Sequence, residues 1–356
     1  MNEKSPQMQF GIFTVSDITQ DPTTGHTPSE AERIRATVEI AKHAEEVGLD
    51  VFALGEHHNP PFWSSSPTTT LAYIAAQTER LIVSTSTTLI TTNDPVKIAE
   101  DYAMLQHLSG GRMDLMLGRG NTGPVYPWFG KDIRQGLPLS IENYALLHQL
   151  WREDVVANNI FWPAEHYQRL IGLYRQRWEH YGHGAPETAI VGLGGQAFMA
   201  KNSQDAVNQF RPYFDNAPVY GHGPSMEDFT EMTPLTVGSP QQVIDRYAGM
   251  RDIFGDYQRQ LFLMDHAGLP LKTVLEQLDF LGGEVVPVLR KEFAKDRPEN
   301  VPDAPTHASL VRAAYGDGPS RQATPRANRG DNLSGPSPYQ DAPAPAGAAF
   351  GVGATR

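Results

Sequence analysis

The stretch Asp50-Val-Phe-Ala-Leu-Gly-Glu-His-His58 decides the fold, because a short apolar run without a helical period leads directly into three polar side chains. Such a run predicts a buried strand. Polar groups that follow a buried strand lie at the rim of a sheet or barrel, where the backbone is fixed and a substrate can enter. We therefore expect Glu56, His57 and His58 to lie at the reactive site, because histidine can accept and donate protons near neutral pH.

Length and composition exclude several classes of protein. The chain has 356 residues, of which 40% are hydrophobic, so it can form one large α/β domain or two small ones. It contains no apolar run of about 18 residues that would predict a membrane span. Its N-terminus lacks the apolar core of a signal peptide, so we expect a cytoplasmic protein. The formal net charge of -12 disfavours nucleic acid and anionic membranes as partners, and the absence of cysteine excludes disulfides and thiolate metal sites.

Apolar strands alternate with amphipathic helices along the chain. Ser29 and Glu32 have the spacing of a capping box, and Asp94 followed by Pro95 is a typical helix start. Alternation without hairpin signals predicts parallel strands joined by right-handed crossovers, in either a closed barrel or an open doubly wound sheet. We predict seven strands, whereas a complete barrel needs eight. They are placed at residues 9–15, 51–54, 81–90, 113–117, 155–161, 188–198 and 260–264.

Two other segments have a different composition. Residues 217–238 are rich in glycine and proline and are predicted to be irregular. From Arg297 onward the chain is dense in Pro, Ala, Gly and Ser with little to bury, so it cannot offset the entropy of ordering. We therefore predict a barrel-like catalytic domain at 1–296 and a disordered tail at 297–356.

Three segments together carry a family resemblance. They are Ala53-Leu-Gly-Glu-His-His58, Val83-Ser-Thr-Ser-Thr-Thr-Leu-Ile90 with Asp94-Pro-Val96, and Leu108-Ser-Gly-Gly-Arg-Met-Asp-Leu-Met-Leu-Gly-Arg-Gly-Asn121. In this order they resemble the bacterial luciferase-like flavin-dependent oxidoreductases. The resemblance implies a TIM-type (β/α) barrel, reduced FMN or the related deazaflavin as cofactor, and a homodimer or heterodimer. It also implies monooxygenation or hydride transfer on a small organic molecule.

The resemblance assigns a catalytic role to one histidine and cofactor contacts to several residues. His57 matches the family's active-site histidine beside the flavin. Thr85, Ser86 and Thr87 match the end of a strand that lies against the isoalloxazine ring, often through a cis peptide that does not involve proline. Arg119 matches an arginine near the flavin, and Asn121 comes from the same loop.

The residues themselves leave alternatives open. Glu56 is either a general base or the group that orients a histidine, and His58 is better explained as structural than as catalytic. Neighbouring residues on an extended chain point to opposite faces, so Glu-His-His is a poor metal site and we predict none. Arg119 could instead pair with an acidic neighbour.

One βα unit of the family's pattern is missing between Val156 and Ala157, in agreement with the count of seven strands. The family's missing helix would bind the FMN phosphate at its N-terminus, so the phosphate site and barrel closure are both in question. We predict a monooxygenase that uses O₂ and reduced FMN supplied by a separate flavin reductase. The alternatives are a deazaflavin-dependent hydride-transfer enzyme and a non-catalytic barrel remnant that acts by association.

Overall fold

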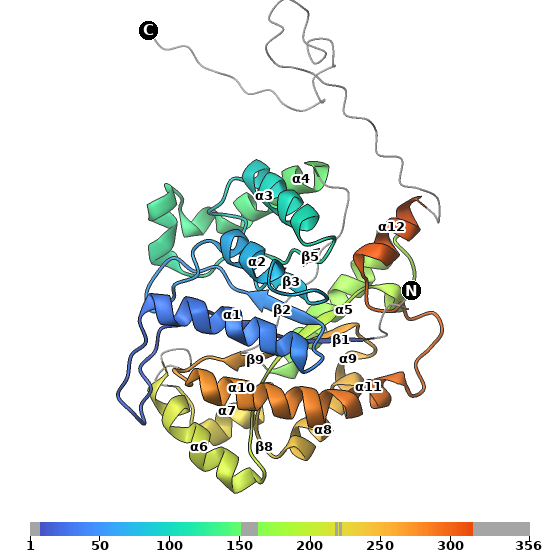
Figure 1. Ribbon diagram of the computed structural model, residues 1–356. Helices are drawn as coiled ribbons and strands as arrows, with labels where there is room; N and C mark the ends of the chain where they lie inside the picture. Colours follow the sequence, from blue (N-terminus) through green and yellow to red (C-terminus); the bar gives the residue numbers. More distant parts are fainter. Residues whose placement is uncertain (1–7, 151–162, 218–219, 221–222, 316–356) are drawn as a thin grey trace, which may run out of the picture. The chain divides into compact units, whose positions relative to one another are not determined.

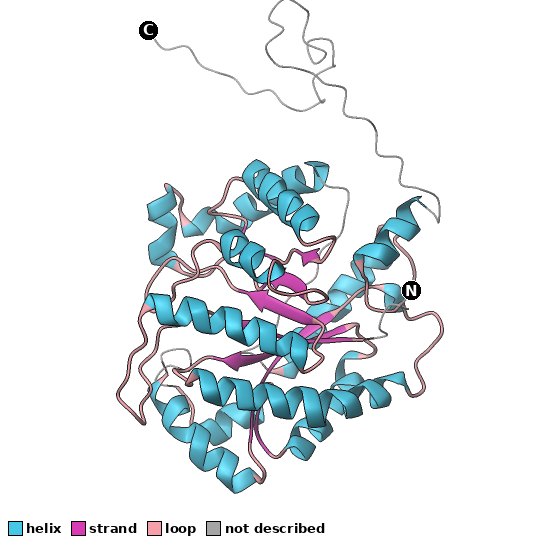
Figure 2. Cartoon of the chain, viewed as in Figure 1, coloured by secondary structure: helices cyan, strands magenta, loops and turns pink. Residues whose placement is uncertain are grey.

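The computed structural model describes residues 8–150, 163–217, 220 and 223–315. The chain divides into two compact units, Met1–Leu310 and Val311–Arg356. All the strands described belong to the first unit. Figure 1 and Figure 2 show these strands near the middle of that unit, with helices around them.

In the described part of the chain, seven strands form the main sheet, and each pairing between them is parallel. In sheet order the strands are β5 (Met113–Asp114), β3 (Ile82–Thr85), β2 (Val51–Leu54), β1 (Gln9–Thr14), β9 (Arg259–Asp265), β7 (Gly192–Met199) and β8 (Leu235–Gly238). A second, two-stranded sheet pairs β4 (Thr88–Leu89) with β6 (Leu117–Gly118).

The predicted fold class is confirmed, because parallel strands alternate with helices as in an α/β barrel. The strand order nevertheless departs from simple sequential winding. β9 pairs with β7, and β8 pairs with the other edge of β7. Within the part of the chain that is described, β5 and β8 are the two ends of the main sheet.

Several predicted elements differ in the structure. The predicted strands 81–90 and 113–117 are each divided in two, the first at the cis peptide bond between Ser86 and Thr87. The prediction that 217–238 is irregular was wrong, since it contains helix α7 (Met226–Met232) and β8. β8 has only four residues between two proline-containing segments, too few to give a periodic signal. The predicted strand 155–161 and the predicted deletion between Val156 and Ala157 lie outside the described residues.

Helices surround the sheet, and their starts follow the capping rules. Ser29 and Glu32 form the predicted capping box of α1, and Asp94 accepts backbone hydrogen bonds at the start of α3. Residues 240–254 form two helices, α8 and α9, which meet at Gly249. The α-helices other than α7 are α1 (Glu30–Glu46), α2 (Pro67–Ala75), α3 (Pro95–Leu108), α4 (Gly136–Leu150), α5 (Ala164–His180), α6 (Ser203–Asn216), α8 (Pro240–Ala248), α9 (Met250–Phe254), α10 (Leu271–Phe280), α11 (Val286–Ala294) and α12 (His307–Tyr315).

Short helices of other types complete the unit. A π-helical turn, η4 (Leu281–Val285), joins α10 to α11, so the helical segment is continuous but not regular. The 3₁₀ helices are η1 (Gly123–Phe129), η2 (Ile133–Gln135) and η3 (Pro186–Thr188).

The sheet separates two apolar clusters. The larger cluster lies between the strands and the helices and includes Phe10, Ile12 and Phe52. The smaller cluster uses the alternate residues of the same strands, among them Phe13 and Ala53. Since side chains alternate across a strand, the two clusters cover opposite faces of the sheet.

The first unit continues beyond residue 296, where the predicted catalytic domain ended. Val301 and Ala304 are buried, and the carbonyl of Pro305 accepts a hydrogen bond from Gln9 of β1 at 3.1 Å. These few apolar anchors are too sparse to raise the hydrophobicity of a segment rich in proline. The helix α12 also falls inside the predicted tail, whereas residues 316–356 lie outside the described residues.

Candidate active site

The predicted site residues lie where β2, β3 and β6 end. In parallel sheets and barrels this carboxyl edge is where ligands bind. Glycine allows these strand ends to approach closely. A Cβ atom added to Gly55 would lie 3.0 Å from the Ser86 carbonyl oxygen and 3.5 Å from His57 Nε2, and one added to Gly118 would lie 1.9 Å from the Thr87 hydroxyl. The glycines therefore bring His57, Ser86, Thr87 and the segment before Arg119 together.

His57 is half-buried, and its imidazole stacks on the ring of Phe62 with centroids 4.1 Å apart. Burial lowers the pKa of His57 to about 4, although Glu56 acts in the opposite direction. The imidazole is thus neutral at physiological pH. Among the described residues it has no side-chain hydrogen-bond partner, so it is able to accept a hydrogen bond or a proton from a ligand.

The carboxylate of Glu56 is hydrogen-bonded to groups other than His57. Its buried carboxylate accepts hydrogen bonds from His58 Nε2 at 2.8 Å, the Leu89 backbone N–H at 3.0 Å and Asn93 Nδ2 at 2.8 Å. Of the two predicted alternatives, this geometry favours the orienting one, and the histidine that Glu56 orients is His58. The His58 ring in turn contacts the edge of Phe129, with centroids 4.7 Å apart.

The three residues at the end of β3 have different surroundings: Thr85 is buried, whereas Ser86 and Thr87 are partly accessible. The Thr85 hydroxyl is buried, donating to the Met116 carbonyl at 2.7 Å and accepting from the Met116 N–H at 2.9 Å. It is therefore committed to joining two strands. Ser86 and Thr87 are half-buried, and the peptide between them is cis, as the resemblance implied.

Arg119 and Asn121 are both exposed at the end of β6. The backbone around Arg119 is fixed, because its carbonyl accepts hydrogen bonds from Tyr126 at 2.6 Å and from Thr91 at 2.5 Å. Among the described acidic residues, none lies within ion-pair distance of the Arg119 guanidinium, so the alternative of an acidic partner has no support there. The side chain is thus available to an anionic group.

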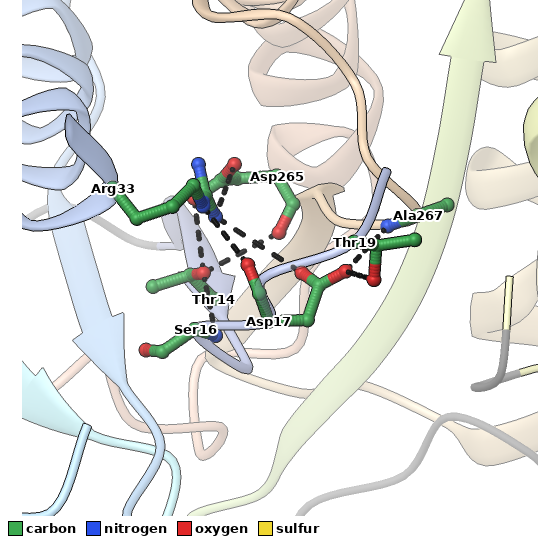
Figure 3. Close-up of polar contacts among 7 residues, drawn as sticks. All are labelled: Thr14, Ser16, Asp17, Thr19, Arg33, Asp265 and Ala267. Atoms are coloured by element: carbon green, nitrogen blue, oxygen red, sulfur yellow. Dashed lines mark hydrogen bonds and ion pairs between the residues drawn. The ribbon is translucent and has the colours of Figure 1, made fainter. Parts of the chain in front are cut away.

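The sequence analysis missed a second polar cluster, at the ends of β1 and β9. Figure 3 shows its centre, the buried Arg33 of α1, which reaches both Asp17 and Asp265. Next to Asp265 stands His266, also buried. An acidic residue and a histidine directly after the apolar strand 260–264 repeat the pattern of Glu56-His57, and that repetition is the signal that could have revealed the cluster.

The described residues bear on three other kinds of site or segment: a metal site, a membrane-spanning helix and a dinucleotide-binding turn. In the described part of the chain, no cluster of three or more His, Asp or Glu residues could hold a metal ion. None of the described helices is both long and apolar enough to cross a membrane. The segment Gly192-Leu-Gly-Gly195 lies inside β7, where Gly195 leaves room for the Tyr247 hydroxyl, so it is no dinucleotide-binding turn.

Comparison with known proteins agrees with the motifs. Residues 8–160 match the model of the luciferase-like monooxygenases. The N-acetyl-S-alkylcysteine monooxygenase of Bacillus subtilis is 32% identical over 100 residues, which are 28% of this chain and 30% of that protein. The chain thus spans about a third of the length of this curated relative.

Solved structures are similar in fold. The monooxygenase RslO1 from Streptomyces bottropensis has a TM-score of 0.68 at 19% identity, covering 79% of this chain and 99% of that one. The oxygenating constituent of 3,6-diketocamphane monooxygenase from Pseudomonas putida, in complex with FMN, has a TM-score of 0.63 at 15% identity. That match covers 79% of this chain and 98% of the other.

The motifs at the ends of β2, β3 and β6 all fall inside the matched segment, and the solved structures share the barrel-type fold. Residues 8–160 therefore match the luciferase-like monooxygenase family, and the resemblance predicted from the motifs is confirmed.

Proposed function

We propose that the protein is a flavin-dependent monooxygenase that uses reduced FMN and O₂ on a small organic substrate. The observation that carries the proposal is the meeting of His57, the Ser86–Thr87 segment and the segment before Arg119 at the carboxyl ends of the strands. The fold and the family match of residues 8–160 support it, because the similar N-acetyl-S-alkylcysteine enzyme of Bacillus subtilis is a monooxygenase.

The residues present fit the ring of a flavin. The Ser86 carbonyl approaches Gly55, and the Thr87 side chain approaches Gly118 so closely that a Cβ at Gly118 would collide with it. This packing fixes a partly exposed peptide edge beside His57, which suits a flat polar ring system. We propose that Ser86 and Thr87 hold the ring and that the exposed Arg119 approaches its negative charge.

When bound, reduced flavin would supply the electrons that activate O₂. The chain's own contribution is then local. His57, neutral because burial lowers its pKa to about 4, would accept a proton or hydrogen bond at the reacting centre. Phe62 holds the imidazole plane by stacking, while Glu56 and His58 fix the loop that carries it. Thr85 keeps β3 in register through Met116.

We also propose a homodimer and a separate reductase. Tyr73 of α2 and Met104 and Leu108 of α3 are 60%, 65% and 69% exposed on helices that contact each other. A group of exposed apolar side chains on packed helices is typical of an interface. The separate reductase rests on the family resemblance alone. A cytoplasmic location stays a prediction from the sequence.

Flavin titration of the purified full-length chain tests the proposal. FMN, riboflavin and the deazaflavin cofactor would each be titrated while flavin and tryptophan fluorescence are followed, with circular dichroism to verify folding. We expect the two flavins to bind. If the predicted deletion removes the phosphate site, riboflavin and FMN should have similar, weak affinities, whereas a strong preference for FMN would show that a phosphate site is present.

The alternatives give different results. Binding of the deazaflavin alone would favour hydride transfer. A folded sample that binds none of the three at high micromolar concentration would overturn the enzymatic proposal and favour the barrel remnant. Sedimentation of Leu108→Glu beside the native chain checks the dimer, with Leu173→Glu on the exposed surface of α5 as the control.

A further inference from the structure

A cleft of about 370 Å³ lies on the outer side of β1 and β9, apart from His57. It is bounded by α1, by the loop from Asp17 to Pro28 and by the loop that joins β9 to α10. Thr14 and Asp265 point toward α1 here, whereas the neighbouring Phe13 belongs to the apolar cluster on the opposite face of the sheet. We call this feature the β1–β9 cleft.

The floor of the cleft is held by the buried Arg33, whose guanidinium pairs with Asp265 (Figure 3). Its Nε donates to the Asp17 carbonyl at 2.9 Å, and its Nη2 lies 3.0 Å and 3.1 Å from the two carboxylate oxygens of Asp265. Thr14 donates to the same carboxylate at 3.0 Å. Because Arg33 is already neutralised by Asp265, its charge is not free to attract an anion into the cleft.

One of the two carboxylate oxygens of Asp17 has no hydrogen-bond partner among the described residues. Its Oδ2 accepts hydrogen bonds from the Thr19 hydroxyl at 2.7 Å and the Ala267 N–H at 3.1 Å. Its Oδ1 lies 4.0 Å from Arg33 Nη2, beyond hydrogen-bond distance, and has no hydrogen-bond partner among the described residues. Asp17 is only 5% exposed, so this oxygen is a buried, charged acceptor in the cleft wall.

His266 supplies a second acceptor. The Tyr220 hydroxyl donates its single proton to Gln196 Oε1 at 3.0 Å, so it must accept from His266 Nε2, which it also contacts. Burial lowers the pKa of His266 to about 4, so the ring is neutral and its one proton resides on Nε2. Nδ1 therefore carries a lone pair, and within the described structure it is buried without a partner.

The walls and rim complete the chemistry of the cleft. Carboxylates outnumber guanidinium groups among the residues that line it, and Glu32 and Glu39 stand exposed at the rim. Pro28, Ala36, Leu269 and Leu271 form an apolar side. An acidic rim, two unsatisfied acceptors at depth and an apolar wall together suit a ligand that has a positively charged donor and a short hydrocarbon part.

We propose that the β1–β9 cleft binds a small organic ammonium ion, with its N–H groups on Asp17 Oδ1 and His266 Nδ1 and its alkyl part against Ala36 and Leu269. This site does not depend on the proposed flavin chemistry. It uses neither His57 nor the strand edge that carries the cis peptide, so either assignment can fail without the other.

Calorimetric titration of the full-length chain with matched probes tests the assignment. The probes are n-butylammonium, neutral 1-pentanol, pentanoate and the zwitterion norvaline. We expect n-butylammonium to bind with one-to-one stoichiometry and to weaken with added salt. If 1-pentanol bound as tightly as n-butylammonium, the cleft would bind the hydrocarbon part alone and the ammonium site would be refuted. Preference for pentanoate or norvaline would show that the N-terminus of α10 or Arg35 governs the cleft, and would overturn the proposal.

Three variants locate the ion. Asp17→Asn should weaken n-butylammonium by about tenfold or more, since a charged acceptor is lost. Ala36→Leu should block the cleft without removing a polar group, and it decides the question if Asp17→Asn does not fold. Glu39→Gln at the rim should weaken binding by about threefold, while Glu30→Gln on the same helix but outside the lining should not. Undiminished binding in folded Ala36→Leu would place the ion elsewhere.

Discussion

Two strands end in an acidic residue followed by a histidine, Glu56-His57 after β2 and Asp265-His266 after β9, and burial lowers the pKa of both histidines to about 4. They differ in what surrounds them. His57 is half-buried, stacked on Phe62 and without a polar side-chain partner among the described residues, whereas His266 is 1% exposed and held through Nε2. The same dipeptide thus marks a candidate catalytic group in one place and, in the other, a buried ring that is held through one nitrogen and leaves only Nδ1 to the β1–β9 cleft.

The neighbouring carboxylates sharpen the contrast. Asp265 neutralises Arg33 and joins β9 to α1, so the β9 end is held together by charge. Glu56 receives three donors and none of them is His57. Partners that saturate a polar group contribute to stability, and a polar group left open to a ligand contributes to function. Four substitutions test this division.

The largest effect is expected for His57→Ala, measured as turnover of a substrate found by screening with reduced FMN. Loss of a positioned proton acceptor typically costs about 10²–10⁴ in rate. FMN affinity should change little. With a pKa of about 4, His57 stays deprotonated as the pH falls from 8 to about 5, so the rate should remain level over that range.

His57→Asn provides the matched control, since it keeps a polar group of similar size that cannot take up the proton. It should be as slow as His57→Ala. Native turnover in either variant would show that His57 has no part in the mechanism, so that it would no longer differ from His266 in having a catalytic role.

Arg33→Met should give the next largest effect, a loss of unfolding free energy of about 3–5 kcal/mol, because Asp265 would be left buried and unpaired. Urea unfolding monitored by circular dichroism measures it. Arg35→Met, an exposed arginine on the same helix, should change stability by less than about 0.5 kcal/mol. Equal losses in the two variants would refute the view that the β9 end is built for stability.

The pH dependence of stability distinguishes His266 from a surface histidine. Its folded pKa of about 4 lies below the ordinary histidine value of 6.5, so the unfolded chain binds more protons between these values. The stabilisation is complete above pH 6.5 and decreases as the pH falls toward 4, by about 3 kcal/mol in all. His266→Gln can still donate to Tyr220 but does not titrate, so its stability should fall less steeply across this window.

The comparison of native and variant chains at each pH cancels the carboxylates that both share. Identical slopes for the two chains would mean that His266 titrates normally, and that its burial has no energetic consequence.

Much of this organisation could be predicted from the sequence, because it is local. The capping box at Ser29 and Glu32 and the apolar run before Glu56 depend on residues a few positions apart, and both elements are present. β8 was missed because Leu235–Gly238 is too short for periodicity. The contact between Arg33 and Asp265 joins residues far apart in sequence, and no pattern in either segment indicates it. Likewise, nothing in Glu56-His57-His58 indicates which histidine the glutamate binds.

Glu56→Gln should have the smallest of the four effects and tests that last point. A glutamine has one acceptor oxygen where the carboxylate has two, so one of the three donors from His58, Leu89 and Asn93 loses its partner. An unmet buried hydrogen bond costs about 1–3 kcal/mol, to be measured by urea unfolding.

Turnover should fall far less than in His57→Ala, since Glu56 holds the loop and does not face the proposed flavin edge. Glu142→Gln, at an exposed position of α4 without an ion pair among the described residues, controls for loss of charge alone. If Glu56→Gln instead abolished turnover while keeping native stability, Glu56 would be the general base, and the two acid–histidine pairs would differ in the role of the acid as well as in that of the histidine.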